Sequence, residues 1–312
     1  MSDAIAPLIG RLAHFGAFAE TTMGTAVLGS VTTGWANATF YDASIEPESF
    51  FSDTERIPLG NFDDNLVASV GKQAGRFSVQ MEVPAYATAT SNPLLLLSPL
   101  AGCLIAAGVT NPVTAMASRK TYTMKLFEAG RVKALYGATG DLTLDLEYGK
   151  RAMATFAGMG CWSAVTDATL PSVAAGSLPW VCTGMTLTVG GAEIGACSKV
   201  QVKLNNQVSM VEDLTASTGY RFAYIASRKP TISIDPEARL VATLDHYGLL
   251  LAGTSVAISI VVTNGSRTLT IAAPVAQRRS ISNGDRNNRR VDNIEFECCR
   301  SSGDDEIVFT FA

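Results

Sequence analysis

The stretch LTLDLEY, residues 142–148, decides the fold because its leucines alternate with polar residues. A period of two places successive side chains on opposite faces of a β-strand. The same alternation recurs in FSVQMEV (77–83), VQVKL (200–204) and IVFTF (307–311). Strands with one apolar and one polar face are typical of antiparallel sandwiches and barrels. The sequence therefore predicts a mainly β protein.

Two segments interrupt the strand pattern and predict helices. The first runs from Asn92-Pro93 to about Ala107, and the second from Asp235-Pro236 to about Leu251. Asn or Asp followed by proline is a favourable helix start, and glycine, a favourable helix stop, follows each segment. The first segment is apolar all round, so we expect it to be enclosed. The second is amphipathic.

The order of elements occurs twice along the chain. A hairpin follows each predicted helix, with turns at Ala129-Gly130 and Asn264-Gly265. Two alternating strands come next, the first of them beginning at Leu142 in one half and at Ile294 in the other. We therefore predict an internal duplication, with two tandem antiparallel β-sandwich or barrel domains that each carry one flanking α-helix. The wider spacing near the end of the second copy is assigned to an insertion at residues 278–290.

The domain boundary is expected in SAVTDATLPSVAAGSLP, residues 163–179, which is small, polar and without periodicity. This divides the chain into a first domain with an N-terminal arm (1–162), a linker (163–179) and a second domain (180–312).

Composition restricts the function classes. The chain has 312 residues, of which 47% are hydrophobic and only 17% charged, with a formal net charge of −4. Soluble proteins average about 25% charged residues. The balance excludes a strongly basic nucleic-acid coat and an acidic disordered chain. Because interface cores are depleted in charge, we expect other subunits to cover part of this surface.

Catalytic and metal-binding patterns are not found in the sequence. There are two histidines and six cysteines, none of the cysteines in a CxxC pair, and no phosphate-loop, dinucleotide, zincin or GxSxG motif. We expect no enzyme activity, no cofactor, no metal site, and free thiols in a reducing compartment. The N-terminal residues do not form a secretion signal, and the longest apolar run is too short for a membrane span, so no membrane insertion is expected.

Two long segments are expected to be loops, at residues 41–71 and 207–227. Long loops within compact domains are usually functional or disordered, and the aromatic content of both argues against disorder. We predict that they dock on a neighbouring subunit; the alternative is that each folds back on its own domain. The candidate contact residues are Phe50, Phe51, Arg56, Phe62, Asp63 and Asp64 in the first segment and Val211, Tyr220, Phe222 and Tyr224 in the second.

Five arginines lie within residues 278–290, namely Arg278, Arg279, Arg286, Arg289 and Arg290. They are interpreted either as partners of acids on an adjacent subunit or as a patch facing DNA. The overall acidity and the lack of interleaved aromatic residues favour the first interpretation.

Several stretches together resemble one protein family. They are PLLLLSPLAGC (93–103), TYTMKLFEAG (121–130), LYGATGDLTL (135–144), Leu170-Pro171, VGG (189–191), SRKPTISIDPE (227–237) and GDDEI (303–307). This pattern resembles the tail tube (major tail) proteins of long-tailed bacteriophages with non-contractile tails, over roughly residues 40–312.

The resemblance implies a structural protein of the virion tail, assembled in the host cytoplasm. It implies rings that stack into a hollow tube, inner strands that join across subunits, and a lumen through which DNA and the tape-measure protein pass. Other tail proteins would be further partners. A duplicated chain implies three copies per ring rather than six. The arginine-rich segment departs from the family pattern.

Two other functions remain open at this point. A tail terminator or tail-tip ring protein would share the fold but form a single ring. A host-surface or carbohydrate-binding β-sandwich module would need an exposed aromatic platform, for which the chain has only three tryptophans.

Overall fold

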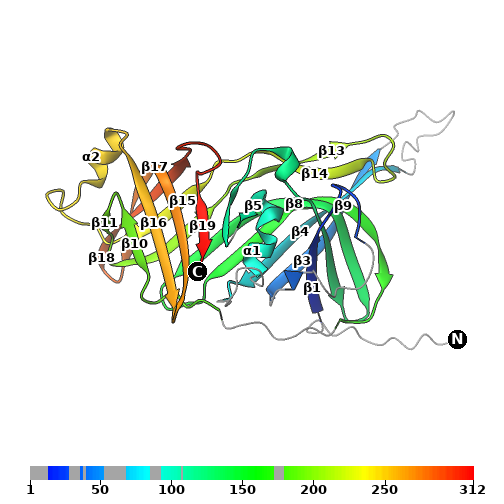
Figure 1. The fold of residues 1–312 in the computed structure, drawn as a ribbon, viewed down its shortest axis with the longest axis horizontal. Coiled ribbons are helices and arrows are strands. Elements are labelled where there is room, and N and C mark those ends of the chain that lie inside the picture. The colour runs from blue at the N-terminus through cyan, green and yellow to red at the C-terminus, as the bar shows by residue number, and fades with distance from the viewer. Residues whose placement is uncertain are drawn as a thin grey trace, which may run out of the picture.

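Antiparallel strands form most of the protein (Figure 1), which confirms the predicted mainly β class. The computed structural model describes residues 13–27, 36–37, 40–52, 68–84, 93–106, 108–171 and 179–312. We call residues 13–171 the first half and residues 179–312 the second half.

The described residues of the first half form nine strands and three short helices. They are β1 (Ala13–Ala19), β2 (Ala36–Asn37), β3 (Phe40–Ser52), β4 (Ser69–Glu82), α1 (Pro93–Leu97), η2 (Ser98–Ala101), β5 (Cys103–Ala106), β6 (Val109–Pro112), η3 (Met116–Ser118), β7 (Tyr122–Glu128), β8 (Arg131–Glu147) and β9 (Met153–Asp167).

The second half contains ten strands and one helix. They are β10 (Thr186–Val189), β11 (Ala192–Glu193), β12 (Cys197–Lys203), β13 (Gln207–Glu212), β14 (Tyr220–Ser227), β15 (Thr231–Pro236), α2 (His246–Leu251), β16 (Ser255–Asn264), β17 (Arg267–Arg286), β18 (Arg289–Cys299) and β19 (Val308–Phe311).

The two halves share one order of strand pairing. In the first half β1 pairs with β7, and pairing continues through β8, β9 and β4 to β3. In the second half β10 pairs with β16, and pairing continues through β17, β18 and β15 to β12. All of these pairs are antiparallel. Two strand pairs join the halves, β8 with β12 and β6 with β19, and isolated bridges link Pro84 to Pro179 and Arg151 to Val181.

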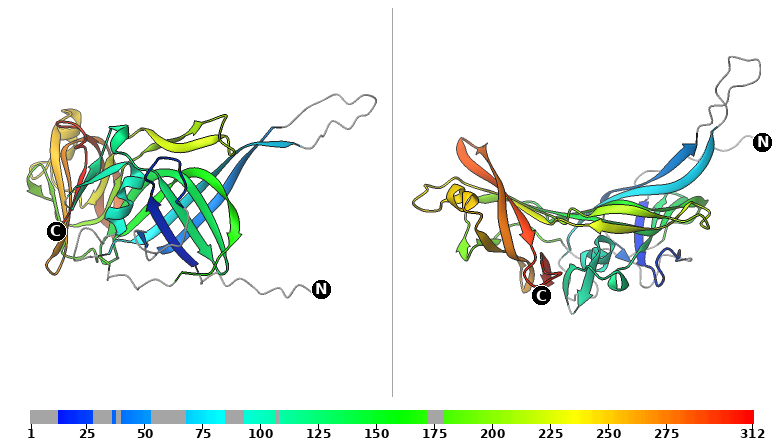
Figure 2. Two further views of the ribbon diagram at one scale, coloured as in Figure 1. Left: turned by 45° about the vertical axis from the view of Figure 1, so that its right-hand side comes forward. Right: turned by 90° about the horizontal axis from the view of Figure 1, so that it is seen from above.

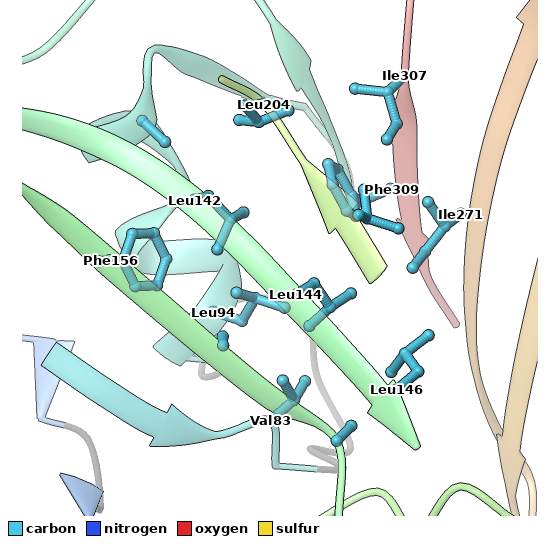
Figure 3. Packing of buried hydrophobic residues seen from close by; sticks show 14 of the residues in the cluster. Val83, Leu94, Leu142, Leu144, Leu146, Phe156, Leu204, Ile271, Ile307 and Phe309 are labelled. Atoms are coloured by element: carbon cyan, nitrogen blue, oxygen red, sulfur yellow. The ribbon is translucent and has the colours of Figure 1, made fainter. Parts of the chain in front are cut away.

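One hydrophobic core runs through both halves. The leucines of the deciding stretch, Leu142, Leu144 and Leu146, are buried and belong to the same cluster as Phe309 and Ile271 of the second half. Figure 3 shows the leucine side chains of β8 pointing toward Phe309 and Ile271. Alternation along β8 therefore supplies the apolar layer on one face and leaves Asp145 and Glu147 on the other.

Both predicted helices are much shorter than expected. The first ends at Leu97, continues as a 3-10 turn and is followed by strand β5, because Cys103–Ala106 pairs with β6. Leu94, Leu97 and Leu100 are buried, as the enclosed segment predicted. In the second segment Asp235 and Pro236 belong to strand β15. The helix begins only after Asp245, whose side chain accepts a hydrogen bond from the amide of Gly248.

The hairpin turns lie where the sequence predicted them. Glu128 pairs with Arg131 across Ala129-Gly130, and Asn264 pairs with Arg267 across the second turn. Gly265 has a φ of 62°, a left-handed conformation that glycine adopts without strain.

The segments expected to be loops are β-hairpins. Strands β3 and β4 include residues 41–52 and 69–71 of the first segment, whose residues 53–67 lie outside the described residues, and β13 and β14 occupy residues 207–227 apart from their turn. The segment at 278–290 is also not a loop or an insertion, because it consists of the end of β17, a tight turn and the start of β18. Ile281 is the one apolar residue of this segment and packs on the core, so no run of alternating apolar residues marks the strands in the sequence.

The assignment of matching strands is corrected by the same pairings. Leu142 lies in β8, whose counterpart in pairing order is β17, whereas the sequence spacing matched Leu142 with Ile294 of β18. Strand β9 also continues to Asp167, into the segment expected to be a linker.

Candidate assembly surfaces

Within the large sheet, the pairing of β8 with β12 joins the halves through eight successive strands, in the order β3, β4, β9, β8, β12, β15, β18, β17. We call this the continuous sheet. At its centre, residues 143–147 of β8 pair with residues 199–203 of β12, and we call this pairing the internal junction. The Gln201 amide donates to Asp145 Oδ1 at 2.7 Å, and Lys199 Nζ lies 3.8 Å from the same oxygen. The internal junction is thus fixed by backbone ladder bonds and by polar side chains on one face.

One face of the continuous sheet packs on the core, and the other is polar. Opposed positions in neighbouring strands define a row that runs from Asp42 through Gln80, Thr155 and Thr143 to Lys203. Acidic residues outnumber basic ones on this polar face. Its acidic members are Asp42, Glu46, Glu48, Glu82, Asp141, Asp145, Glu147, Asp235, Glu295 and Glu297, and its basic members are Lys72, Arg76, Lys199, Lys203, Arg279, Arg286 and Arg289.

The β13–β14 hairpin of the second half lies across the first half of its own chain. Tyr220 is buried against Ala74 and Cys161, and Phe222 lies over Gly137. The backbone amide of Gln73 donates to the Thr218 carbonyl at 2.9 Å. This contact is within one chain, whereas a contact with a neighbouring subunit was predicted from the sequence.

Three glycines of the first half make room for this hairpin. A Cβ at Gly24 would lie 2.4 Å from the Arg221 carbonyl oxygen, one at Gly137 would lie 2.9 Å from Phe222 Cα, and one at Gly102 would lie 2.5 Å from Ile225 Cδ1. All three also have positive φ. We call these glycines the hairpin seat. The hairpin seat was not predicted from the sequence, although the repeated glycines of LYGATG offered a signal for Gly137.

Buried polar contacts hold the hairpin seat in place. The Glu20 carboxylate is 2% exposed and accepts hydrogen bonds from Thr121 Oγ1, Thr123 Oγ1 and the amides of Gly24 and Gly137, at 2.5 to 2.8 Å. A buried carboxylate is stable when its oxygens are fully hydrogen-bonded. Glu20 therefore orders two of the three glycines.

The remaining predicted contact residues lie on β13 and β14 and take part in the pairing of these two strands. Val211 pairs with Phe222, and Tyr224 pairs with Ser209, and each of the four is partly exposed. Their proposed role in contacts between chains stays a prediction.

The β3–β4 hairpin has no comparable seat among the described residues. Phe50 and Phe51 are 46% and 62% exposed, and Val70, opposite Phe51, is 46% exposed. Figure 2 shows this hairpin projecting past the β13–β14 turn, where Phe50 makes an edge contact with Tyr220. Lys72 pairs with Glu212 at the same place, and the hydrogen bond that Lys72 donates to Glu212 raises the pKa of Lys72. The predicted contact residues Arg56, Phe62, Asp63 and Asp64 lie outside the described residues.

Three of the five arginines pair with acids of their own chain. Arg279 Nε lies 2.6 Å from Glu297, Arg286 Nη1 lies 3.2 Å from Asp235, and Arg289 Nη1 lies 3.0 Å from Glu237. The hydrogen bond from Arg289 holds the pKa of Glu237 below its ordinary value. Contacts of these arginines with another subunit or with DNA stay predictions.

The other two arginines differ in environment. Arg290 is exposed and lies opposite Asp285 in the β17–β18 hairpin. Arg278 is 4% exposed with its guanidinium 5.2 Å from the Phe296 ring centroid, and burial lowers its pKa. Two of its nitrogens have no hydrogen-bond partner among the described residues.

Arg228 connects the two halves close to the pairing of β6 with β19. It pairs with Asp304 at 2.7 Å and Glu306 at 3.2 Å, and Asp304 also accepts a hydrogen bond from the amide of Thr114 in the first half. These contacts tie the connection before β19 to the connection after β6.

Within the described ranges, no group of three or more His, Cys, Asp or Glu side chains is placed to hold a metal ion. The six cysteines, all within those ranges, are free, and burial raises the pKa of Cys103, Cys161, Cys197 and Cys298 to about 12. No helix in the described part is long and apolar enough to cross a membrane.

A family model described as phage tail tube protein matches residues 10–298, nearly the whole chain. The chain belongs to the phage tail tube protein family. No curated protein matches it. Membership in this structural family implies self-assembly, contact with other tail proteins and a place in the virion tail. Tube families of this kind are typically not enzymes.

Proposed function

We propose that three copies of this tail tube protein form a ring, and that rings stack into a hollow tube through which phage DNA passes during ejection. The observation that carries this proposal is the internal junction. Two halves with the same strand order are joined edge to edge, so each chain behaves as two successive tube domains of a ring. These domains divide between Asp167, where β9 ends, and Pro179.

The size of the resulting barrel supports three copies. Three continuous sheets of eight strands would supply 24 strands. With strands about 4.8 Å apart and tilted by about 40°, the barrel would be about 48 Å across between backbones. Inward side chains narrow this bore, which still admits a DNA duplex. Six copies would double the diameter to about 96 Å, far wider than a duplex needs.

The polar face of the continuous sheet is the face available to line the lumen, because the opposite face packs on the core. Its excess of acidic residues would repel DNA phosphates. Binding to nucleic acid depends mainly on cationic contacts with phosphates, so an acidic wall would let DNA pass without sticking. The chain would act as a wall and guide, with no catalytic role and no cofactor.

Electron microscopy of the purified protein tests this function. We expect rings that stack into tubes of uniform width. A protein that stays a globular monomer at every concentration would overturn the proposal. Copy number per virion separates a tube from a terminator or tail-tip ring, since a tube needs many rings and the alternatives need one.

A further inference from the structure

The two hairpins correspond residue by residue, because the ladder irregularities of one recur in the other. Near the base of the β3–β4 hairpin, the ladder shifts beside the pair Phe40–Met81, and the second half shifts beside the pair Cys197–Pro236. The residue numbers differ by 157 on the first strand and 155 on the second.

A second shift occurs further out on each hairpin. It lies beside Phe51–Val70 in the first half and beside Val208–Ile225 in the second. The numbers again differ by 157 and 155. Two coincident bulges fix the correspondence, since a bulge adds one residue at a defined ladder position. Residues 42–46 of β3 therefore match residues 199–203 of β12.

The same correspondence, followed through the paired strands, matches β8 with β17. Val79 of β4 matches Ile234 of β15, and these residues pair with Phe156 and Ile294 respectively. Phe156 pairs in turn with Leu142 of β8, while Ile294 pairs with Ile281 of β17. Leu142 therefore matches Ile281, and residues 143–147 match residues 282–286.

We propose that each contact between chains repeats the internal junction, with residues 282–286 of β17 pairing antiparallel with residues 42–46 of β3 in a second copy. Glu147 pairs with Lys199 within the chain, so Arg286 would lie opposite Asp42 of the second copy. Thr143 pairs with Lys203, so Ser282 would lie opposite Glu46 of the second copy. This inference rests on the proposed ring and adds its strand pairs and register.

Both edges are available for this pairing. β16 pairs with β17 only as far as Gln277, so among the described residues no strand covers that edge of β17 beyond it. β3 pairs only with β4 in the same part of the chain. The two edges belong to the first and last strands of the continuous sheet and lie toward opposite ends of the molecule (Figure 2). Open strand edges favour association, and ring closure removes them.

The charge at the proposed contact is complementary. The internal junction places an acid of β8 opposite a lysine of β12. The proposed contact reverses this arrangement, with the basic residue Arg286 on β17 and the acidic residue Asp42 on β3. Opposite charges directly across an antiparallel pair are stabilising, and like charges are destabilising.

The surroundings of the hairpin seat have a counterpart in the second half, which supports the proposed contact. Ile225 is 6% exposed because it packs beside Gly102, the residue after η2. Val70, at the matching position, is 46% exposed, and the glycine that follows the helix of the second half, Gly253, is also exposed with a φ of 62°. Leu251 beside it is 89% exposed. The proposed contact brings Phe51 and Val70 of the second copy to this open surface.

Disulfide cross-linking tests the register. Cysteines are introduced as Ser282→Cys and Glu46→Cys in a background with Cys197→Ser and Cys299→Ser, which removes the two partly exposed native thiols. Opposed residues in antiparallel strands lie within disulfide range. Thr143→Cys with Lys203→Cys is the positive control at the internal junction. Ser282→Cys with Ser78→Cys is the matched negative control, because Ser78 lies on the same face one strand further in.

Mild oxidation of the assembled double variant should give covalent dimers and trimers and nothing larger, with at least a tenfold higher yield than the Ser78 control. Equal yields, or products that extend beyond three chains, would overturn the proposed contact. If rings and tubes form but the Ser282–Glu46 pair does not cross-link, the register is wrong while the tube function stands. If no rings form and no cross-link appears, both proposals fail.

Discussion

The two halves share their strand order but differ in what covers them. Ile225 of the seated hairpin is 6% exposed, whereas Val70 at the matching position of the other hairpin is 46% exposed. The helices differ in the same way, since Leu97 of α1 is 1% exposed and Leu251 of α2 is 89% exposed. Among the described residues of one chain, only the first half is covered by a hairpin of the other half. The second half therefore leaves exposed a surface beside α2, whose counterpart beside α1 is covered by a hairpin in the first half.

The largest expected effect on stability comes from a substitution in the hairpin seat, on which the β13–β14 hairpin packs. Gly137→Ala should lower the free energy of unfolding by about 3 kcal/mol, because the added Cβ meets the Phe222 backbone and the residue has a φ of 58°. Gly149→Ala is the matched control, since Gly149 also has positive φ but has no atom within 4 Å of the added Cβ. It should cost only about 1 kcal/mol. Urea denaturation measures both, and equal losses would show that the glycine seat does not hold the hairpin.

A smaller loss is expected at the joint between the halves. Arg228→Met should destabilise the protein by about 2 kcal/mol, because Asp304 and Glu306 lose a mostly buried partner. Lys150→Met removes the exposed pair with Glu147 and should change stability by less than about 0.5 kcal/mol. Thermal unfolding followed by circular dichroism compares them. A loss at Arg228 no greater than at Lys150 would contradict a structural joint.

The protein should lose stability in acid because of the buried His246 in the second half. Burial lowers the pKa of His246 from its ordinary 6.5, with Arg278 and Arg239 adding to this and Asp292 and Asp245 opposing it. The unfolded chain therefore binds a proton before the folded one, and this contribution to stability is lost as pH falls below about 6.5. His246→Gln should lose less stability between pH 7 and pH 5 than the parent. Parallel pH profiles for the two proteins would contradict this assignment.

The smallest effect on the stability of the isolated chain is expected at Leu251, where a substitution should instead weaken assembly. Leu251→Ser should leave the free energy of unfolding within about 0.5 kcal/mol, because the side chain is already exposed. It should nevertheless raise the protein concentration needed for ring formation. Leu97→Ala, at the covered helix, should instead cost about 3 kcal/mol. Light scattering against concentration measures assembly, and an unchanged threshold for Leu251→Ser would remove this leucine from the contact.

The sequence predicted the core of the fold well. Strands with one buried face, such as β8 and β15, were found because their apolar residues alternate, and the hairpin turns were found because Asn-Gly and Ala-Gly follow apolar strands. Strand segments that project from the core were missed. β3, the outer part of β4 and the end of β17 carry few buried apolar residues, so their alternation is weak and they were predicted as loops or as an insertion.

The helices were predicted too long for a related reason. Cys103–Ala106 continues an apolar run, and periodicity cannot separate a buried helix from a short buried strand. The proline after Asp235 resembles a helix start, but here it ends a strand whose partner shifts register. Long-range pairing decides both cases, and a single sequence carries no record of it.

The candidate surfaces were predicted in part. Aromatic residues in the two long segments marked the hairpins as contact elements, and Tyr220 does pack on another part of the protein. The target of that packing, the hairpin seat of the first half, was missed, because Gly24, Gly102 and Gly137 lie far apart in the sequence and meet only in the fold, and the glycines of LYGATG signal only Gly137.

A cryo-electron microscopy reconstruction of the assembled tube, at a resolution that separates strands, tests the central claim most directly. The account predicts three chains per ring and a closed barrel in which β17 of each chain pairs with β3 of the next, with Arg286 opposite Asp42. A ring of six chains, or a barrel in which β17 and β3 are not neighbours, would contradict it.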